Sequence, residues 1–461
     1  MTTAIPDWSA LQRALEGDVV LPDSPVYESV RKPAITRFHD VRPQAVVLCR
    51  TPADVAETLS LARSSGLRVA ARSGGHCFAG RSSTDGVAID VTPMDAVSVA
   101  DGVVTVGAGT RLGALYDGLA EHDLTLPAGC GPDVGIAGLT LGGGLGILGR
   151  MHGLTCDQLV SAQVVLADGR VVDSDAHHDE DLFWALRGAG GGNFGVVTSF
   201  VFRTLVMPVA TSFRLAWPYS HAARVIDAWQ ACSPSAPPEL AASLLVTASP
   251  DVEEPPAVTV FGAMIGSESE AAELLEQFVA AVGVDPEAAR REQRSYRETK
   301  RHLSEVGASE GPVEVAPEGH PYSKSEFFRR RLPADAIAAL VDHFASDRVP
   351  GEARELDFSP WGGAYNRVPA DATAFVHRAE RFLLKQAVVV DPGASSVDTE
   401  AARRWLARSW ELAHPWGAGG VYPNFPDPDL AEPACAYYGS NYSRLLRIKE
   451  RYDPGSFFEL T

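Results

Sequence analysis

Long apolar stretches and an excess of positive charge are both missing from this chain of 461 residues. No run of about eighteen apolar residues is present, which excludes a membrane-spanning helix. Residues 1–11 contain neither a basic segment nor an apolar one, so we expect no secretory signal, no membrane partner and a cytoplasmic protein. The net charge of −19 disfavours nucleic acid as a partner, because its phosphates are negatively charged.

Cysteine is scarce and scattered. No two cysteines form a Cys-x-x-Cys pair, which excludes a zinc ribbon and a disulfide scaffold. We therefore expect no metal site. The six residues are Cys49, Cys77, Cys130, Cys156, Cys232 and Cys435. The hydrophobic content of 45% instead predicts a globular protein with sizeable cores.

Glycine, in contrast, is concentrated in one stretch. Residues 127–153 contain ten glycines among 27 residues, together with seven Val, Leu and Ile residues. Glycine has no Cβ, so a backbone rich in it can approach a ligand closely and turn several amides toward an anion. A flexible linker would be polar and rich in serine. The stretch therefore predicts a ligand cradle, and a cofactor is the natural ligand.

A shorter motif, Arg-Ser-Gly-Gly-His at residues 72–76, follows a predicted strand at 67–70. Its glycine amides and the Arg72 guanidinium could hold a pyrophosphate together with residues 135–146. The spacing is not that of a Gly-x-Gly-x-x-Gly dinucleotide motif or of a P-loop. On its own, His76 is better explained as a packed histidine than as a catalytic one.

The composition changes near residue 205, where the glycine density drops. Long helices and long strands from there to about residue 415 favour an α+β arrangement with helices packed on an antiparallel sheet. The pattern predicts helices at 220–230, 267–282 and 334–344, and strands at 212–216, 244–247, 257–264, 354–358, 373–377 and 382–389. A loop is predicted at 304–321, a helix at 443–452, and a type I′ hairpin turn at Asp168-Gly169.

The two glycine motifs, taken together, resemble segments of the berberine bridge enzyme-like flavoprotein oxidases. These belong to the vanillyl-alcohol oxidase / p-cresol methylhydroxylase (PCMH) superfamily. Residues 72–80 resemble the first flavin segment of that family, and residues 127–146 and 188–198 resemble the second and third. Later landmarks follow in the same order at 324–325, 362–364, 373–378, 422–425 and 441–454. The resemblance therefore covers nearly the whole chain.

This resemblance implies an α+β fold. A two-lobed PCMH-type FAD-binding domain would occupy residues 1–204, with its core at about 41–204. An α+β cap domain that binds the substrate, with an antiparallel sheet covered by helices, would occupy residues 205–415. Residues 416–461 would return to the FAD-binding domain.

The resemblance also implies FAD as the cofactor. His76 matches the histidine that is covalently bonded to FAD in this family, which reverses its interpretation as a packed residue. Many members add a bond from a cysteine, but Gly131 stands at that position and Cys130 lies one residue earlier. Either the loop shifts so that Cys130 still reaches the flavin, or FAD is attached through His76 alone.

Residue by residue, the resemblance extends the candidate flavin site. Besides His76, the candidates are Arg72, Ser73, Gly74, Gly75, Val134, Gly135, Gly138, Leu141, Gly142, Gly143, Gly146, Gly195, Val197, Tyr422, Asn424 and Asn441. Val134 matches the position that controls oxygen access in this family, where valine goes with oxidase behaviour. The resemblance thus implies O2 as the electron acceptor and H2O2 as a product.

The catalytic base departs from the family pattern. Members often use the last tyrosine of a Tyr-x-Asn-Tyr motif, and Phe425 stands at that position here. Tyr422, Tyr365 and His377 are the main candidates instead, and Tyr438 and Tyr442 are further alternatives. A tyrosine base needs its pKa lowered from about 10 by a nearby cation or by contacts with the flavin.

We therefore expect an FAD-dependent oxidase that transfers hydride from a CH–OH or similar activated centre of a small molecule to flavin N5. A secondary metabolite is favoured over a sugar as substrate, because Phe425 departs from the usual base position. The alternatives are a flavin-dependent dehydrogenase or cyclase that does not use O2, and a non-catalytic flavin-binding protein. The sequence specifies neither the substrate nor an oligomeric state.

Overall fold

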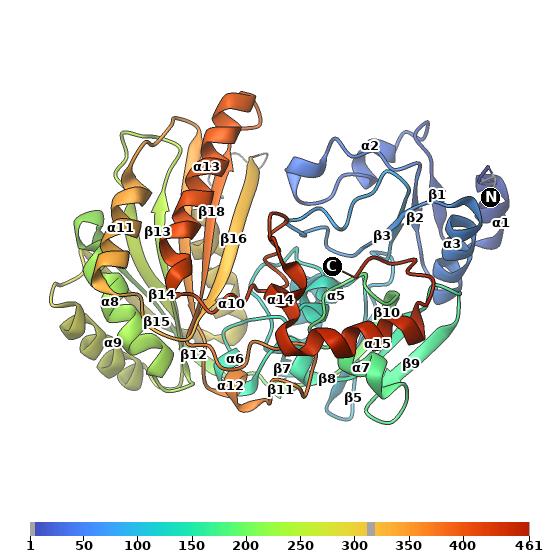
Figure 1. Cartoon of the computed structure of the whole chain (residues 1–461). Helices are drawn as coiled ribbons and strands as arrows, with labels where there is room; N and C mark the ends of the chain where they lie inside the picture. The colour runs from blue at the N-terminus through green and yellow to red at the C-terminus, as the bar shows by residue number, and fades with distance from the viewer. Residues whose placement is uncertain (1–4, 311–318, 461) are drawn as a thin grey trace.

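The computed structural model describes residues 5–310 and 319–460, which form two lobes side by side (Figure 1). The first lobe holds strands β1 to β11 and the C-terminal helices α14 and α15, and the cap lobe holds strands β12 to β18 (Figure 1). The first and last described residues, 5 and 460, both belong to the first lobe (Figure 1). No helix among the described residues is long and apolar enough to cross a membrane.

The first lobe is built on two main sheets. The four-stranded sheet has the order β1-β2-β4-β3, in which β2, β4 and β3 run parallel. The five-stranded sheet has the order β5-β6-β10-β8-β9 and is antiparallel throughout. A short pair, β7 and β11, stands apart. The bounds are β1 Asp18–Val20, β2 Ala45–Leu48, β3 Val69–Arg72, β4 Val87–Asp90, β5 Val97–Ala100, β6 Val103–Gly107, β7 Leu124–Thr125, β8 Leu159–Val165, β9 Val171–Asp175, β10 Val196–Arg203 and β11 Leu205–Val206.

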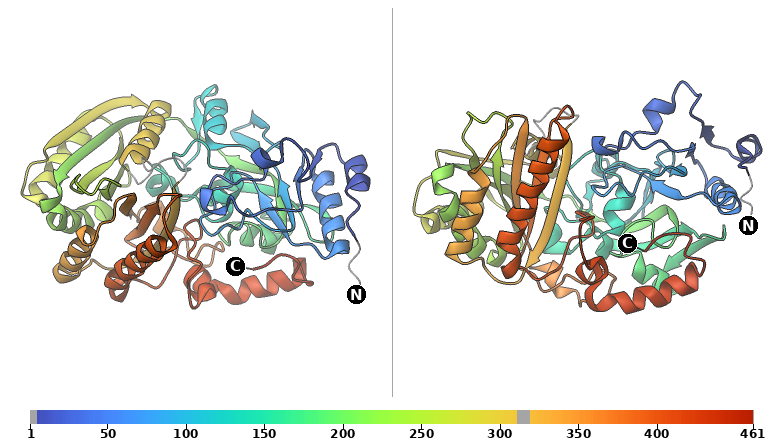
Figure 2. Two further views of the ribbon diagram at one scale, coloured as in Figure 1. Left: turned by 90° about the horizontal axis from the view of Figure 1, so that it is seen from above. Right: turned by 45° about the horizontal axis from the view of Figure 1, so that its top comes forward.

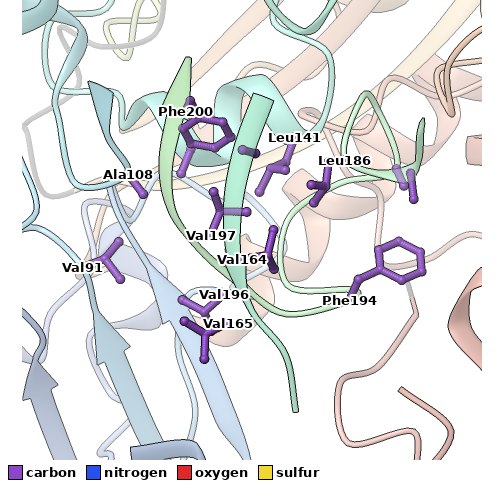
Figure 3. Packing of buried hydrophobic residues seen from close by; sticks show 14 of the residues in the cluster. Val91, Ala108, Leu141, Val164, Val165, Leu186, Phe194, Val196, Val197 and Phe200 are labelled. Atoms are coloured by element: carbon purple, nitrogen blue, oxygen red, sulfur yellow. The ribbon is translucent and has the colours of Figure 1, made fainter. Parts of the chain in front are cut away.

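Apolar side chains from both sheets and from the covering helices form one core. Figure 3 shows Val164 of β8 and Phe200 of β10 packed near Leu141 and Leu186. Each such buried side chain contributes roughly 1.5–3 kcal/mol. The helices of this lobe are α1 Trp8–Ala14, α2 Tyr27–Val30, α3 Pro52–Ser65, α4 Leu112–Ala120, α5 Ile136–Leu141, α6 Gly149–His152, α7 Glu180–Ala185, α14 Pro433–Tyr438 and α15 Tyr442–Tyr452.

The cap lobe contains one seven-stranded antiparallel sheet in the order β15-β12-β14-β13-β17-β18-β16. Helices α8, α9, α11 and α13 cover one of its faces, and the other face is turned toward the first lobe (Figures 1 and 2). The strands are β12 Val209–Pro218, β13 Leu240–Ala248, β14 Ala257–Ile265, β15 Ala288–Ser295, β16 His320–Phe328, β17 Glu352–Pro360 and β18 Phe382–Val390. The helices are α8 Ala222–Cys232, α9 Glu268–Val282, α10 Tyr296–Glu310, α11 Ala334–Ala345, α12 Ala364–Arg367 and α13 Ser396–Ala413.

The period-two pattern of β17 decides which of its side chains face each way. Leu356 and Phe358 join the core under the covering helices. Because successive side chains of a strand alternate between faces, Glu355 and Asp357 point to the opposite face, toward the first lobe. The same alternation places Lys385 of β18 on that face. The expected antiparallel sheet covered by helices is confirmed, and its inner face carries charge.

Three local predictions are wrong. Residues 373–377 are not a strand: Ala374 N and Phe375 N donate to the carbonyls of Trp184 and Arg187 in the first lobe, 3.2 Å away in each case, and not to a sheet. The loop predicted at 304–321 contains the end of α10 and the start of β16. Residues 311–318 of that prediction lie outside the described residues.

The turn at Asp168-Gly169 also differs from the prediction. A type I′ turn requires positive φ at both central residues, and only Gly169 has it, with φ 87°. Leu166 N donates to Arg170 O at 2.9 Å, so the hairpin loop has three residues and places its glycine at the left-handed position.

The C-terminal segment returns to the first lobe, where α15 lies along α7 (Figure 1). Arg444 forms an ion pair with Asp181 at 2.8 Å, and the Tyr452 hydroxyl donates to Asp179 at 2.7 Å. The predicted helix at 443–452 is confirmed as α15. The chain thus closes a site in the first lobe with residues from both ends of the sequence.

Candidate flavin site

A cavity of about 810 Å³ lies in the first lobe. Segments that follow β3, the long glycine stretch, the start of β10 and the C-terminal segment all contribute to its lining. The predicted residues that line it are Arg72, Ser73, Gly74, Gly75, His76, Val134, Gly135, Gly138, Leu141, Gly195, Val197, Tyr422 and Asn424. The structure therefore brings most of the candidate flavin-binding residues to one cavity.

The two glycine motifs touch each other at this cavity. A Cβ atom built on Gly74 would lie 2.2 Å from the Gly135 nitrogen, so a side chain there would separate the two segments. Arg111 fastens the same contact, since its Nη1 donates to the carbonyls of Gly74 at 2.7 Å and Asp133 at 2.6 Å. The motifs that lie sixty residues apart in the sequence therefore form one continuous wall.

Other glycines leave space where a ligand can approach the backbone. A Cβ atom on Gly138 or Gly192, both in the lining, would meet nothing within 4 Å. Uncovered amides in such a wall suit the phosphates of a dinucleotide. The volume of the cavity and this exposed backbone fit an FAD molecule.

Arg72 supports this wall from within. Its guanidinium is buried and donates to the carbonyls of Ser82 at 3.0 Å and Val30 at 2.8 Å. Burial lowers its pKa, with Asp90 opposing that shift. Arg72 therefore fixes the loop around residue 82, which also lines the cavity.

His76 has the features of a ligand-bonding residue. It lines the cavity, and its Nε2 is buried with no hydrogen-bond partner among the described residues. Burial and the charge of Arg111 lower its pKa, so the imidazole is neutral and nucleophilic at neutral pH. The Nε2 atom is thus a buried polar atom without a partner among the described residues, in a residue of the cavity lining.

Cys130 lies differently from its two neighbours. Gly129 and Gly131 line the cavity, whereas Cys130 packs against a separate apolar cluster that includes Ile147 and Tyr296. Burial raises the pKa of its thiol. The position that matches the family cysteine, Gly131, therefore faces the cavity without a sulfur atom.

Tyr422 and Asn424 hold the glycine stretch from the cap side of the cavity. The Tyr422 hydroxyl accepts from the nitrogens of Gly144 at 3.0 Å and Leu145 at 3.1 Å, and from Asn424 Nδ2 at 3.1 Å. These donors favour the phenolate, but burial has the larger effect and raises the Tyr422 pKa to about 12. The protein alone therefore keeps this hydroxyl protonated.

The other two main candidates for the catalytic base, Tyr365 and His377, lie behind the cavity wall. Tyr365 stacks on Trp361 with 4.3 Å between ring centres, and its hydroxyl donates to Gly146 O at 3.2 Å. His377 stacks on Phe327 with 4.6 Å between ring centres, and burial lowers its pKa to about 3. Neither belongs to the cavity lining.

Four predicted flavin ligands also stand away from the lining. Asn441 Nδ2 donates to the carbonyls of Ala370 at 2.7 Å and Thr373 at 3.1 Å, and so fixes the segment that was predicted to be a strand. Gly142, Gly143 and Gly146 pack against neighbouring protein atoms. These four shape the wall without being part of its surface.

Comparison with known proteins agrees with this site. Residues 43–175 match a family model described as FAD binding domain, and residues 421–461 match one described as Berberine and berberine like. The uncharacterized FAD-linked oxidoreductase YvdP of Bacillus subtilis (strain 168) is 32% identical over 451 residues, which cover 96% of this chain and 97% of that protein. The chain belongs to the berberine bridge enzyme-like family of FAD-linked oxidoreductases.

Two further family members support the assignment. Aclacinomycin-N/aclacinomycin-A oxidase of Streptomyces galilaeus is 30% identical, with 90% of this chain and 84% of that protein covered. The solved structure of Physcomitrella patens BBE-like 1 is 26% identical and superposes with a TM-score of 0.86 over 98% of this chain and 97% of that one. The expected family, fold class and enzyme class are thereby confirmed.

Several residues that line the cavity are not among the candidates named from the sequence. The segments 81–85, 190–193 and 457–459 line the cavity as well. Gly190 and Gly192 have positive φ, of 96° and 78°, which only glycine adopts easily. The glycine cluster at 188–195 was the signal for the second segment, while the first and third carry no distinctive composition.

A charged cluster on the cap sheet was also missed. Lys385 Nζ lies 2.6 Å from a carboxylate oxygen of Glu355 and 3.8 Å from one of Asp357, and 5.3 Å from the ring centre of Phe425. Phe425 lines the cavity and Lys385 lies beside its ring, whereas none of the three charged residues is itself in the lining. Two acids two residues apart in one predicted strand, and a lysine in a later predicted strand, were the only trace of this cluster in the sequence.

These charges perturb one another. The pKa of Asp357 is raised to about 6. Burial is the largest cause, the Glu355 charge adds to it, and the Lys385 charge offsets it only in part. Burial lowers the pKa of Lys385, but the two carboxylates together outweigh burial, so its pKa is raised. No group of three His, Cys, Asp or Glu side chains suited to a metal occurs within 5–310 and 319–460.

Proposed function

We propose that this FAD-linked oxidoreductase is an oxidase of a CH–OH or similar activated centre in a secondary metabolite. Asp357 removes a proton from the substrate, and O2 is the final electron acceptor. FAD is attached through His76 alone. The observation that carries the proposal is the Glu355–Asp357–Lys385 cluster beside Phe425, at the border between the cap sheet and the flavin cavity.

When bound, FAD supplies the hydride acceptor at N5 and returns the electrons to O2 as H2O2. The chain's own residues do the rest. The His76 imidazole holds the cofactor, and the open backbone at Gly138 and Gly192 leaves room for its phosphates. Val134, a small side chain on the lining, leaves a path for a small oxidant.

Asp357 suits the task of a general base. A base works best when its pKa lies near the operating pH, and burial brings the pKa of Asp357 to about 6. Its side chain is 21% exposed, so a substrate can reach it. Lys385 carries a positive charge 3.8 Å away and stabilises the carboxylate before it accepts the proton. The carboxylate of Asp357 on β17 thus takes the role of the tyrosine that is missing at Phe425.

A secondary metabolite is the favoured substrate class. Phe425 presents an apolar ring edge at the cavity, and Phe78 lies 6.1 Å from it between ring centres. Aromatic faces of this kind suit a flat, apolar ligand better than a sugar with many hydroxyl groups. A relative named for the oxidation of aclacinomycins supports the same choice.

An anaerobic screen tests the proposal. Purified enzyme is mixed without O2 with a panel of polycyclic aromatic alcohols and a panel of mono- and oligosaccharides, and the flavin absorbance is followed. We expect bleaching by members of the first panel, and one H2O2 per flavin once air is admitted. Bleaching without subsequent oxidation by O2 would show a dehydrogenase, and bleaching by the saccharides alone would overturn the substrate class.

A further inference from the structure

Lys300 is a buried ammonium at the seam between the two lobes. It belongs to α10 of the cap lobe and is only 4% exposed. Its Nζ donates to the Tyr116 hydroxyl at 2.5 Å, to Gly129 O at 3.0 Å and to Ala128 O. All three donor positions of the ammonium are therefore used on groups of the first lobe.

The loop that Lys300 holds is part of the flavin cavity. Gly129 and Gly131 line the cavity, and neither contributes a side chain that could anchor the loop. Tyr116 of α4 donates a second hydrogen bond to Gly129 O, at 2.6 Å. The loop is thus held from behind, by groups on the side opposite to the ligand.

The same loop supports the residue at the proposed oxygen path. Val134 N donates to Gly131 O at 3.3 Å, and a Cβ atom on Gly131 would lie 3.1 Å from Val134 Cγ2. A displacement of residues 129–131 would therefore move Val134 too. Lys300 is connected to the cavity wall through two carbonyls and to Val134 through the loop itself.

A buried ammonium is unfavourable unless its donors are satisfied, and an apolar side chain of similar length would avoid the loss of hydration. Here the satisfied donors fix a segment of glycines that has little conformational preference of its own. The charge also remains behind the wall, in a region that excludes water. A fixed positive charge at that place favours the more negative, reduced form of a flavin bound on the other side.

We propose that Lys300 is a positioning residue that fixes the flavin-facing loop 128–131 from the cap lobe and sets the charge behind it. Its hydrogen bonds hold this loop in place, as a covalent bond between FAD and a cysteine at position 131 would do. This role depends on FAD in the cavity and is independent of the substrate and the acceptor proposed above.

The test compares Lys300→Met with Arg297→Met in the FAD-loaded protein. Arg297 lies on the same helix and pairs with Asp117 of α4 across the same seam, but it is exposed and has no contact with the loop. Two quantities are measured without any substrate: amide hydrogen exchange of residues 129–135 and the midpoint potential of the flavin. For K300M we expect exchange about tenfold faster or more at these amides, since bonds from a charged donor are lost, and a lower potential. R297M should leave both unchanged.

Three outcomes would overturn the proposal. They are wild-type exchange and potential in K300M, faster exchange spread evenly over α10 and the cap sheet, or equal effects in R297M. Tyr116→Phe provides a milder variant in case K300M does not fold, because it removes one partner and keeps the ammonium. It should speed exchange at Gly129 alone, and unchanged exchange there would contradict the role of this network. Failure of the substrate screen would leave these readouts unaffected.

Discussion

The two sides of the flavin cavity are built in different ways. On the side of the first lobe, the wall consists of backbone from short contiguous motifs, with contacts such as that between Gly74 and Gly135. On the cap side, behind Phe425 of the lining, the groups that we propose to be reactive are side chains from separate strands, Asp357 on β17 and Lys385 on β18. The residue types at Gly74 and Gly135 can hardly vary, because a Cβ atom on either residue would break the contact between them.

This difference separates binding from chemistry. We infer that the FAD of this family is held by amides and glycines, whose geometry depends on the fold. A substrate that differs between members is met by side chains on a sheet, where one substitution changes charge and reach without altering the backbone. We infer that the first side determines which cofactor binds, and the cap side which molecule reacts.

The largest effect is expected on the first side, from His76→Ala. This change removes the imidazole that we propose to hold FAD, so no flavin should remain with the protein after acid precipitation. The control is Cys130→Ser, which should retain all of it. The measurement is flavin fluorescence of the denatured protein on a gel. Acid-stable flavin in H76A would contradict attachment through His76 alone and implicate Cys130.

The next effect is expected on the cap side, from Asp357→Asn. Loss of a general base typically lowers kcat by about 10²- to 10⁴-fold, and FAD content should not change. In the native enzyme the base must be ionised, so kcat/KM should fall as the pH drops through about 6, the value to which burial raises the Asp357 pKa. D357N should lose that acid limb.

Asp429→Asn is the matched control for D357N. Asp429 is a half-exposed carboxylate of the C-terminal segment, 3.8 Å from Lys324 and outside the cavity lining. It should leave both kcat and the pH profile as they are. A D357N enzyme with native kcat would place the base elsewhere, and Tyr422 would then be the next residue to replace.

The contrast between the two sides also explains what the sequence could predict. The motif 72–76 and the stretch 127–146 are contiguous, so their residue types reveal the ligand before the fold is known. Their meeting at Gly74 and Gly135 follows from family resemblance but not from spacing. The helix-covered cap sheet was likewise predictable, because its strands and helices are long and periodic.

The cap-side cluster could not be predicted with the same procedure. Glu355 and Asp357 lie in one predicted strand and Lys385 in another, and only the pairing of β17 with β18 brings them together. Residues 373–377 show the converse problem, since an apolar β-like segment bonds to the first lobe instead of a sheet. Whether the Cys130 side chain points into the cavity depends on the loop conformation. The types of the neighbouring residues do not determine that conformation.

A smaller effect on the first side is expected from Val134→Leu. A bulkier side chain on the lining should hinder O2, and crowding of this kind costs roughly 1–3 kcal/mol, which corresponds to about 5- to 160-fold in rate. The measurement is the rate constant for oxidation of chemically reduced enzyme by O2, with substrate reduction recorded separately. Val134→Ala is the control and should not slow the reaction with O2. Equal rates in V134L and the native enzyme would remove Val134 from the oxygen path.

The smallest effect is expected where the two sides meet, from Cys130→Ser. Cys130 packs on the cluster of Ile147 and Tyr296 and not on the cavity, and burial keeps its thiol neutral by raising the pKa. Replacing sulfur with a hydroxyl in this apolar place should lower the free energy of unfolding by about 1 kcal/mol. The flavin spectrum and the acid-stable flavin should not change. Cys435→Ser, at an exposed cysteine, should alter neither quantity. A shifted flavin spectrum in C130S with native stability would mean that the sulfur reaches the flavin, and the wall of the first side would then use a side chain after all.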